Sequence, residues 1–473
     1  MRSLSRWKIR RGALAAVGAL AVSVAGYAAP AGAAPVSRTS EPTGSVSSSS
    51  VEGTPALVEA GTKQEKIRQL VQCGGTMYAV GFFSEIGQDG TTYLRNNVFS
   101  FSATAPFAVT AWNPDVSGRV NSIAFNGSDC SDAYIGGKFT SVGSTPAENI
   151  AEVDTTTGAV VPAFGTDATG SVDTLLGVKG HLLVGGQFTR INGSRTDPYM
   201  ASVSPVTGQD DGFLHLSISG HYHYCDSTGA CTTNTLTDIN NQQLSHGGTL
   251  DLVEGDFTSV GGLPRQQIFM LNLATDPATV TGWTSPEWDG SNPSYPYQCV
   301  VVEAYYIRSA AWSPNDSTVY IATTGYHPWN LPVGSYPRSG LCDAAAAFPA
   351  TQTSVTHLWV EYTGCDSYYS VAADDGTVYV AGHPRWAENP NGCNYAGPGA
   401  ISDPGLQGLN PSNGSLELTS AGKPVYRMAR ANADDMLITS AGLWIASSNR
   451  YGAQKCAHND GHSGICFLPY PTS

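Results

Sequence analysis

The stretch YIGGKFTSVG, Tyr134–Gly143, recurs along this chain with small changes. Related stretches begin at Tyr78 (YAVGFFSEIG), at Leu182 (LLVGGQFTRING) and at Asp251 (DLVEGDFTSVGG). Each has a run of apolar or small residues that leads to a glycine, a variable residue, Phe, and then Ser or Thr. Repetition of one phrase in this way predicts a repeated structural unit.

The glycine two residues before the Phe of each phrase serves as a marker of the repeat. Weaker copies, in VYIATTG, VYVAGHP and LWIASSN, continue the series. The marker positions are Gly81, Gly137, Gly186, Gly255, Thr323, Gly382 and Ser447. Intervals of about fifty to seventy residues, filled with short runs of strand formers, favour propeller blades over helical repeats. The sequence therefore predicts an all-β, seven-bladed β-propeller over residues 54–473.

The second unit illustrates the strands expected within a blade. VNSIAF (120–125), AYIGGKF (133–139), NIAEVD (149–154) and AVVPAF (159–164) are separated by turn residues. Four short strands joined by turns predict one antiparallel blade. Period-two alternation places the marker glycine and the following Phe on one face, where the glycine admits a neighbouring backbone and the Phe fills the gap between blades.

The last unit contains only three such runs before the chain stops. TPALVEA, residues 54–60, precedes the first complete blade and is expected to supply the missing strand. Pairing of the two ends would close the ring and leave no free blade edge.

The first 33 residues indicate export. Five Lys/Arg residues precede an apolar run that begins at Gly12, and small residues surround Ala31 and Ala33. This pattern is typical of a secretory signal peptide, residues 1–33, so we expect an extracellular protein with no membrane span in the mature chain. Residues 34–53 are expected to form a flexible Ser-rich leader.

Ten cysteines in an exported chain favour disulfides over metal sites. Cys73 and Cys130 each precede a repeat phrase, so a bond between adjacent repeats is expected. Two further pairs would close small loops, namely Cys225 with Cys231 and Cys456 with Cys466. The sequence does not pair Cys299, Cys342, Cys365 and Cys393.

The formal charge of −14 argues against nucleic acid or an anionic membrane surface as the partner, because both need clusters of Lys and Arg. Removal of the signal peptide leaves 19 basic residues against 38 acidic ones. No G-x-S-x-G, H-E-x-x-H or P-loop motif occurs, and we expect no cofactor. The chain is expected to be a monomer.

These features resemble the secreted actinobacterial β-propellers built from GG-x-F-[TS]-x-[VI]-G repeats, a family whose domain has no assigned function (the delta-60-type repeat). The resemblance covers roughly residues 54–470 and is carried by IGGKFTSVG, VGGQFTRING and VEGDFTSVGG, by WNP at 112–114, and by AGHPRWAENPNG near the end. It implies the propeller fold, but it implies no established activity and supplies no catalytic residues to carry over to this sequence.

Blades that depart from the repeat are the places to look for function. HPRW contributes His383, Arg385 and Trp386, with Asn389 close behind, and YHPWN contributes Trp329. Arginine and tryptophan together suit a sugar or carboxylate ligand. The alternative is a structural loop whose Arg and Trp pack over the adjacent blade.

HYHYC places His221 and His223 on one face of an extended segment, where two imidazoles could hold zinc or copper. No third ligand is identifiable, so a solvated insertion loop is the favoured interpretation. The leading functional hypothesis is therefore a secreted module that binds an extracellular glycan or protein through loops of the later blades. The alternative is a polysaccharide hydrolase or lyase with its site at the propeller mouth.

Overall fold

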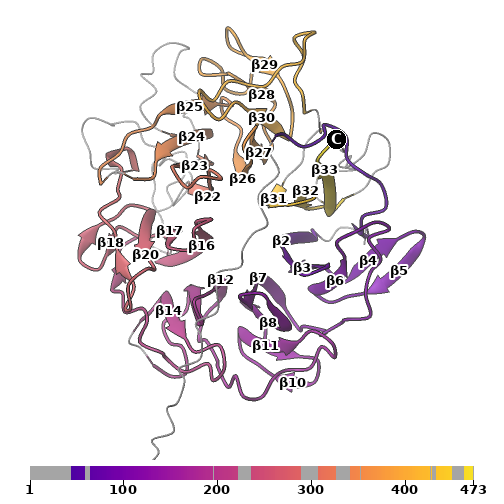
Figure 1. Ribbon diagram of the computed structural model, residues 1–473, viewed down its shortest axis with the longest axis vertical. Helices are drawn as coiled ribbons and strands as arrows, with labels where there is room; N and C mark the ends of the chain where they lie inside the picture. The colour runs from indigo at the N-terminus through magenta and orange to yellow at the C-terminus, as the bar shows by residue number, and fades with distance from the viewer. Residues whose placement is uncertain are drawn as a thin grey trace, which may run out of the picture.

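The structure is a computed structural model that describes residues 44–58, 64–194, 197–221, 236–288, 307–325, 341–351, 353–426, 428, 433–449 and 463–471. Over these residues the chain consists of strands, turns and one 3-10 turn, η1 (Pro286–Trp288). Figure 1 shows antiparallel sheets arranged side by side around a common axis, which is the architecture of a β-propeller.

Each main sheet begins with a strand next to the axis (Figure 1). These inner strands are β2 (Lys66–Cys73), β7 (Arg119–Asn126), β12 (Val172–Val178), β16 (Asp238–Leu244), β22 (Ile307–Trp312), β26 (Tyr368–Ala373) and β31 (Ala433–Thr439).

A hairpin joins each inner strand to a second strand, which pairs with a third farther from the axis. The second strands are β3 (Thr76–Phe82), β8 (Asp129–Lys138), β13 (His181–Gly186), β17 (Leu250–Asp256), β23 (Thr318–Thr323), β27 (Val378–Gly382) and β32 (Gly442–Ser447). The third strands are β6 (Val98–Ser102), β11 (Ile150–Asp154), β14 (Met200–Val203), β20 (Ile268–Asn272), β24 (Ala344–Pro349), β30 (Gln407–Leu409) and β33 (Ile465–Pro469).

The fourth strand expected in every blade is reduced in most sheets. Only β21 (Thr279–Val280) and β25 (Trp359–Tyr362) extend a described main sheet to four strands. In the second unit, the predicted strand 159–164 is a single bridge between Val160 and Val153, and Pro162 within it lacks the N–H that a longer ladder would need.

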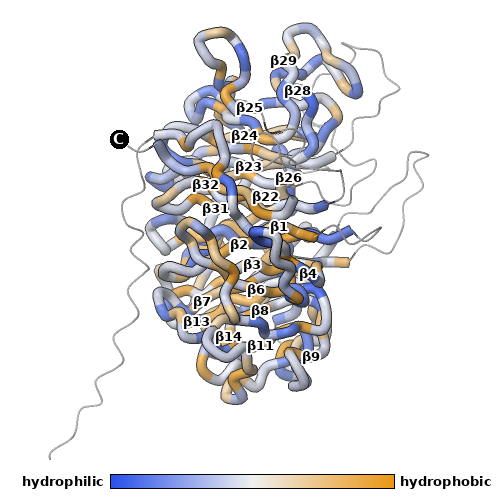
Figure 2. Tube along the Cα trace, turned by 90° about the vertical axis from the view of Figure 1, so that its right-hand side faces the viewer, coloured by the Kyte–Doolittle hydropathy of each residue, from blue (hydrophilic) through white to orange (hydrophobic). Residues whose placement is uncertain are grey.

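Small sheets form between the second and third strands, on the face where the inner strands begin. They comprise β1 (Ala56–Leu57), β4 (Glu85–Gln88) and β5 (Thr91–Leu94); β9 (Ser141–Val142) and β10 (Thr145–Pro146); β15 (Ile218–Ser219), β18 (Ser259–Val260) and β19 (Leu263–Pro264); and β28 (Trp386–Ala387) and β29 (Ile401–Ser402). In the edge view of Figure 2, β4 and β9 lie toward the right-hand side of the ring.

The marker glycines have the close backbone contact that the sequence predicts. A Cβ added to Gly81 would lie 2.0 Å from the carbonyl oxygen of Lys66, and one added to Gly137 would lie 2.2 Å from that of Arg119. The Phe residues that follow, Phe83 and Phe139, are buried. A side chain at Gly81 or Gly137 would therefore push the inner strand away from its partner.

Hydrophobic clusters lie between neighbouring sheets. Tyr78 of β3, for example, shares a cluster with Ile135 of β8. The first and last sheets are joined in the same way, because Phe101 of β6 packs edge-on against Trp444 of β32 with the ring centroids 5.6 Å apart.

The N-terminal segment runs beside β33. The N–H groups of Ser47, Val51 and Leu57 donate to the carbonyl oxygens of Pro469, Phe467 and Ser463, at 2.8, 3.0 and 2.9 Å. This contact includes residues 44–53 of the expected leader, of which Val46 is buried. The expected closing strand, residues 54–60, is described up to residue 58, and Ala56–Leu57 pairs with β4.

Candidate binding face

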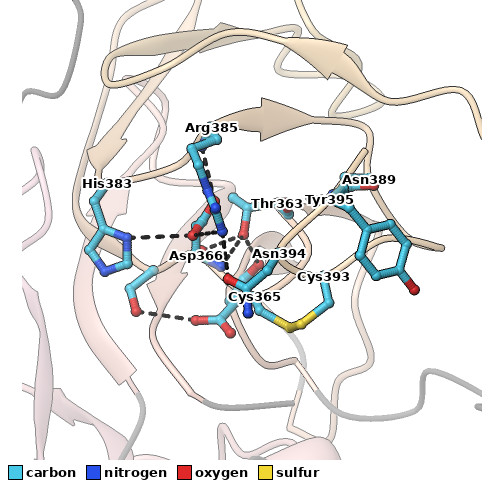
Figure 3. The surroundings of a disulfide bond; sticks show 11 residues. Thr363, Cys365, Asp366, His383, Arg385, Asn389, Cys393, Asn394 and Tyr395 are labelled. Carbon is cyan, nitrogen blue, oxygen red and sulfur yellow. Dashed lines mark hydrogen bonds and ion pairs between the residues drawn. A yellow bond between two sulfur atoms is a disulfide. The ribbon is translucent and has the colours of Figure 1, made fainter. Parts of the chain in front are cut away.

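The predicted HPRW cluster lies between β27 and β30 and is organised around a carboxylate (Figure 3). The Arg385 Nε and Nη2 donate to Oδ2 and Oδ1 of Asp366, both at 2.8 Å, and Nη2 also donates to Asn394 Oδ1 at 2.7 Å. His383 lies on the other side of Asp366, with its Nδ1 3.8 Å from Oδ1. Asp366 thus orients two of the predicted ligand-binding side chains.

The charge state of Asp366 follows from these contacts. Burial raises the pKa of this carboxyl, but the hydrogen bonds from His383 and Arg385 and their positive charges outweigh burial. The pKa of Asp366 therefore lies below its usual value, and the group is a carboxylate at neutral pH.

Trp386 lies beneath the guanidinium of Arg385, whose Cζ is 4.5 Å from the ring centroid. Both side chains are partly exposed, and Arg385 retains 38% of its side-chain surface. Stacking of a guanidinium on an indole leaves a planar polar group and an aromatic edge open to solvent.

Asn389 is fully buried and acts within the loop itself. Its Nδ2 donates to the carbonyl oxygens of Thr363 and Tyr395 at 3.1 and 3.2 Å, and its Oδ1 accepts from Gly397 N–H at 2.8 Å. The structure thus places this predicted ligand residue where it holds the loop. A disulfide between Cys365 and Cys393, with an S–S distance of 2.02 Å, also holds the loop (Figure 3).

Several other predicted residues lie outside the described part of the chain, namely Trp329, His223, Cys225, Cys231 and Cys456. His221 is described and half-buried.

The predicted pair Cys73 and Cys130 forms a disulfide with an S–S distance of 1.92 Å. Cys466 and Cys342 are also disulfide-bonded, to partners outside the described residues.

A second group of polar residues, which sequence reasoning missed, surrounds the axis. Each inner strand has a β-bulge after its first apolar residue, so that one extra residue faces the partner strand next to the marker position. The bulged residues are Arg68, Asn121, Asp173, Asn240, Arg308, Tyr369 and Asp434. All are polar, and all lie at the end of the axis where the loops between second and third strands emerge.

A repeated signal for these residues is visible in the sequence. An apolar residue followed by two polar ones, or by Tyr-Ser in one unit, recurs as IRQ, VNS, VDT, INN, IRS, YYS and ADD, starting at residues 67, 120, 172, 239, 307, 368 and 433. The second polar residue bonds the adjacent inner strand in several units. The acceptors and donors are Gln69 Oε1 with Ile123 N–H (2.7 Å), Ser122 Oγ with Leu175 N–H (3.0 Å), Ser309 Oγ with Val371 N–H (3.4 Å) and Asp435 Oδ2 with Leu70 N–H (2.9 Å).

Charges of both signs meet at this end of the axis. Lys66 Nζ lies 2.8 Å from Asp434 Oδ1. Asn121 Nδ2 donates to Asp173 Oδ1 at 2.6 Å. Burial raises the pKa of Asp173, although a hydrogen bond from Ser171 and the charges of Arg68 and Arg119 oppose the rise.

The loop cluster and the axial residues adjoin each other. The ring of Tyr369, a bulged residue, packs edge-on against His383 with the centroids 5.3 Å apart. The face therefore presents a continuous set of polar and aromatic groups from the axis to Trp386.

Asp197, Asp210 and His215 form the only group within the described residues whose ligand atoms, all within 4.8 Å of one another, have the spacing of a metal site. His215 Nδ1 lies 3.0 Å from Asp197 Oδ2, and this hydrogen bond raises the pKa of the imidazole. A protonated imidazole competes with metal binding, so the group as described is a hydrogen-bonded pair with a nearby carboxylate.

No family model matches the sequence, and no curated protein matches it. Among solved structures, the chain is similar to that of U3-55K and to the WD40 repeats of RRP9, each at 8% identity with a TM-score of 0.45, covering 89% of this chain and 99% of the other. A computationally designed protein, Ika8, has the same identity and coverage with a TM-score of 0.41. The fold assignment rests on the sheet arrangement described above.

None of the described segments forms a helix that is long and apolar enough to span a membrane.

Proposed function

We propose that this chain is an extracellular, seven-bladed β-propeller, related to the family with GG-x-F repeats, that binds a glycan or protein ligand through loops of its later blades. The observation that carries the proposal is the loop between β27 and β30. There, Asp366 fixes Arg385 over Trp386, and His383 of the same loop packs against the axial residue Tyr369. A guanidinium and an indole that are held in place lose little conformational entropy on binding.

In this proposal the N-terminal segment closes the ring, which makes it a rigid scaffold for such a site. The backbone hydrogen bonds from Ser47, Val51 and Leu57 to the last described strand region give that sheet an additional neighbour. The Asp435–Leu70 hydrogen bond links the last inner strand to the first. A ring without free edges keeps binding loops in fixed relative positions.

The test is a binding screen of the mature chain against cell-wall glycans, soluble polysaccharides and surface proteins, followed by titration of the hits. Trp386→Ala is expected to weaken binding at least tenfold, because aromatic and arginine anchors dominate interfaces. Gln72→Ala, an exposed change at the opposite end of β2, serves as the control and leaves affinity unchanged. A hit whose affinity is the same in both variants contradicts the placement of the site on this loop.

A polysaccharide hydrolase or lyase is the second candidate. It is favoured by Asp173 and Asp238, two carboxyls on neighbouring inner strands at the axial end of the face. Burial raises the pKa of Asp238 to about 6, with the charge of Asp173 adding to the effect. An acid with a pKa of about 6 beside a second carboxyl suits acid–base cleavage of a glycosidic bond. Release of reducing ends or unsaturated products, abolished by Asp173→Asn, would establish this activity, and no turnover across the same panel removes it.

A further inference from the structure

Two arginines at the axial end of the binding face differ from the other arginines around them. Arg95 and Arg265 each donate to two backbone carbonyl oxygens, and Arg385 is bound to Asp366. Arg68 and Arg119, by contrast, have no hydrogen bond or ion pair with any residue that the structure describes. The Nε of Arg119 is nevertheless buried. A half-buried guanidinium that makes no hydrogen bond to a described residue carries a desolvation cost that is only partly offset.

The charges of the two guanidinium groups act on one carboxyl. Arg68 is the bulged residue of β2, and β7 begins at Arg119. The positive charges of both residues act to lower the pKa of Asp173 in β12. The inner strands β2, β7 and β12 follow one another around the axis (Figure 1). Arg68 and Arg119 therefore lie at the same end of two adjacent inner strands.

Unsatisfied acceptors lie at the same place. Asn121 is 5% exposed, and its Oδ1 has no hydrogen-bond partner among the described residues, although its Nδ2 is fully used. The Oδ2 of Asp173 is likewise buried without a partner. Both acceptors carry a desolvation cost that no described residue offsets. The site therefore combines two guanidinium donors with two buried acceptors behind them.

The geometry points to a subsite for the carboxylate of an acidic sugar residue, such as a terminal uronic acid, bound by Arg68 and Arg119. This inference rests on the proposed glycan-binding function and names the chemistry of its ligand. Guanidinium groups match carboxylate oxygens in pairs, so two arginines at one end of adjacent inner strands suit a carboxylate ligand.

Neighbouring side chains fit the same ligand. Lys138 pairs in register with Arg119 and is exposed, so it adds a positive charge, whereas Lys66 is largely neutralised by Asp434. Phe82, in register with Lys66, is 48% exposed and offers an aromatic face to a sugar ring. Because the whole chain is acidic, at −14, long-range attraction does not favour a polyanion, and recognition depends on these few local cations.

The experiment uses calorimetric titration of the mature chain with a short uronic-acid-terminated oligosaccharide. The matched probe is the same oligosaccharide with its carboxyl reduced to an alcohol. Arg68→Ala and Arg119→Ala are each expected to weaken binding of the acidic probe tenfold or more, since a hydrogen bond to a charged group is lost. Arg190→Ala, a substitution on the same face but away from the inner strands, leaves binding unchanged. Thermal melts of all variants verify folding.

Three outcomes overturn the inference. Equal affinity for the acidic and the reduced probe, or affinity insensitive to both arginine substitutions, shows that no carboxylate is recognised here and leaves the proposed binding function standing. Binding of peptide C-terminal carboxylates or of a sulfated oligosaccharide in preference to the uronic acid shows a different ligand class. Failure of every glycan to bind, with a surface protein bound through Trp386 instead, removes the sugar ligand while keeping the loop site.

Discussion

Glu254 provides a sharp test of how the repeat is packed. It occupies the position that is Gly136 and Gly185 in other copies of the phrase, where a Cβ would approach the next inner strand within 2.4 and 2.6 Å. The Glu254 side chain is 1% exposed, and neither carboxyl oxygen accepts a hydrogen bond of normal geometry among the described residues. Burial raises the pKa of Glu254 to about 8, which the nearby Asn241 amide and Ala310 N–H offset only in part.

The pH dependence follows from this shift. Below pH 4.5, the usual value, Glu254 is protonated in both folded and unfolded chains. As the pH rises from 4.5 to about 8, the unfolded chain ionises first, so the free energy of unfolding falls by about 1.4 kcal/mol per pH unit. The loss attributable to Glu254 is therefore roughly 3 kcal/mol at pH 7 and ends above pH 8.

Glu254→Gln removes this titration while keeping the shape of the side chain. We expect the difference in unfolding free energy between Glu254→Gln and the wild type to rise by roughly 3 kcal/mol from pH 4.5 to pH 7. Urea unfolding at pH 4.5, 6, 7 and 8 measures it, and the titrations of other acids largely cancel in the difference. If the glutamine amide changes the unfolding free energy by the same amount at every pH, the pH dependence of the difference between variant and wild type is unaffected.

Glu148→Gln, at an exposed site, is the control and should show no such rise. A pH-independent difference for Glu254→Gln would show that the folded carboxyl ionises as freely as the unfolded one. The tight inter-blade packing inferred at this position would then be wrong.

Three further predictions concern stability and the loop. Replacing Cys73 and Cys130 by Ser should cost roughly 4 kcal/mol in urea unfolding, because the bond closes a loop with a sequence separation of 57; an unchanged midpoint would contradict this. Deleting residues 44–58 should lower the Tm by well over 10 °C, because buried side chains and the hydrogen bonds to the last strand are lost. An unchanged melting temperature would refute ring closure. Asp366→Asn should destabilise the chain at pH 7, and the destabilisation should shrink as the pH falls through the lowered pKa of Asp366. The reason is that Asp366 stabilises the fold only while it is a carboxylate. Equal destabilisation at pH 7 and at low pH would contradict the pairing with Arg385.

Much of the architecture is readable from the sequence because the repeat phrase encodes it locally. Strand formers before a glycine predict the second strand of each sheet, and turn residues predict its hairpin, since both depend on neighbouring residues only. The related positions of Cys73 and Cys130 predict their bond for a similar reason, because adjacent repeats place equivalent residues side by side.

The tertiary structure alone decides which distant groups meet. Asp366 was not a candidate from sequence, yet it organises Arg385 from 19 residues away. The bulged residues become one set only when the inner strands surround a common axis. Which described groups lie close enough to bond Arg68 is likewise decided by the packing of the sheets. Local backbone preference determines that strands form, whereas burial, charge pairing and unmet hydrogen bonds arise between sheets, where no sequence spacing sets the distance.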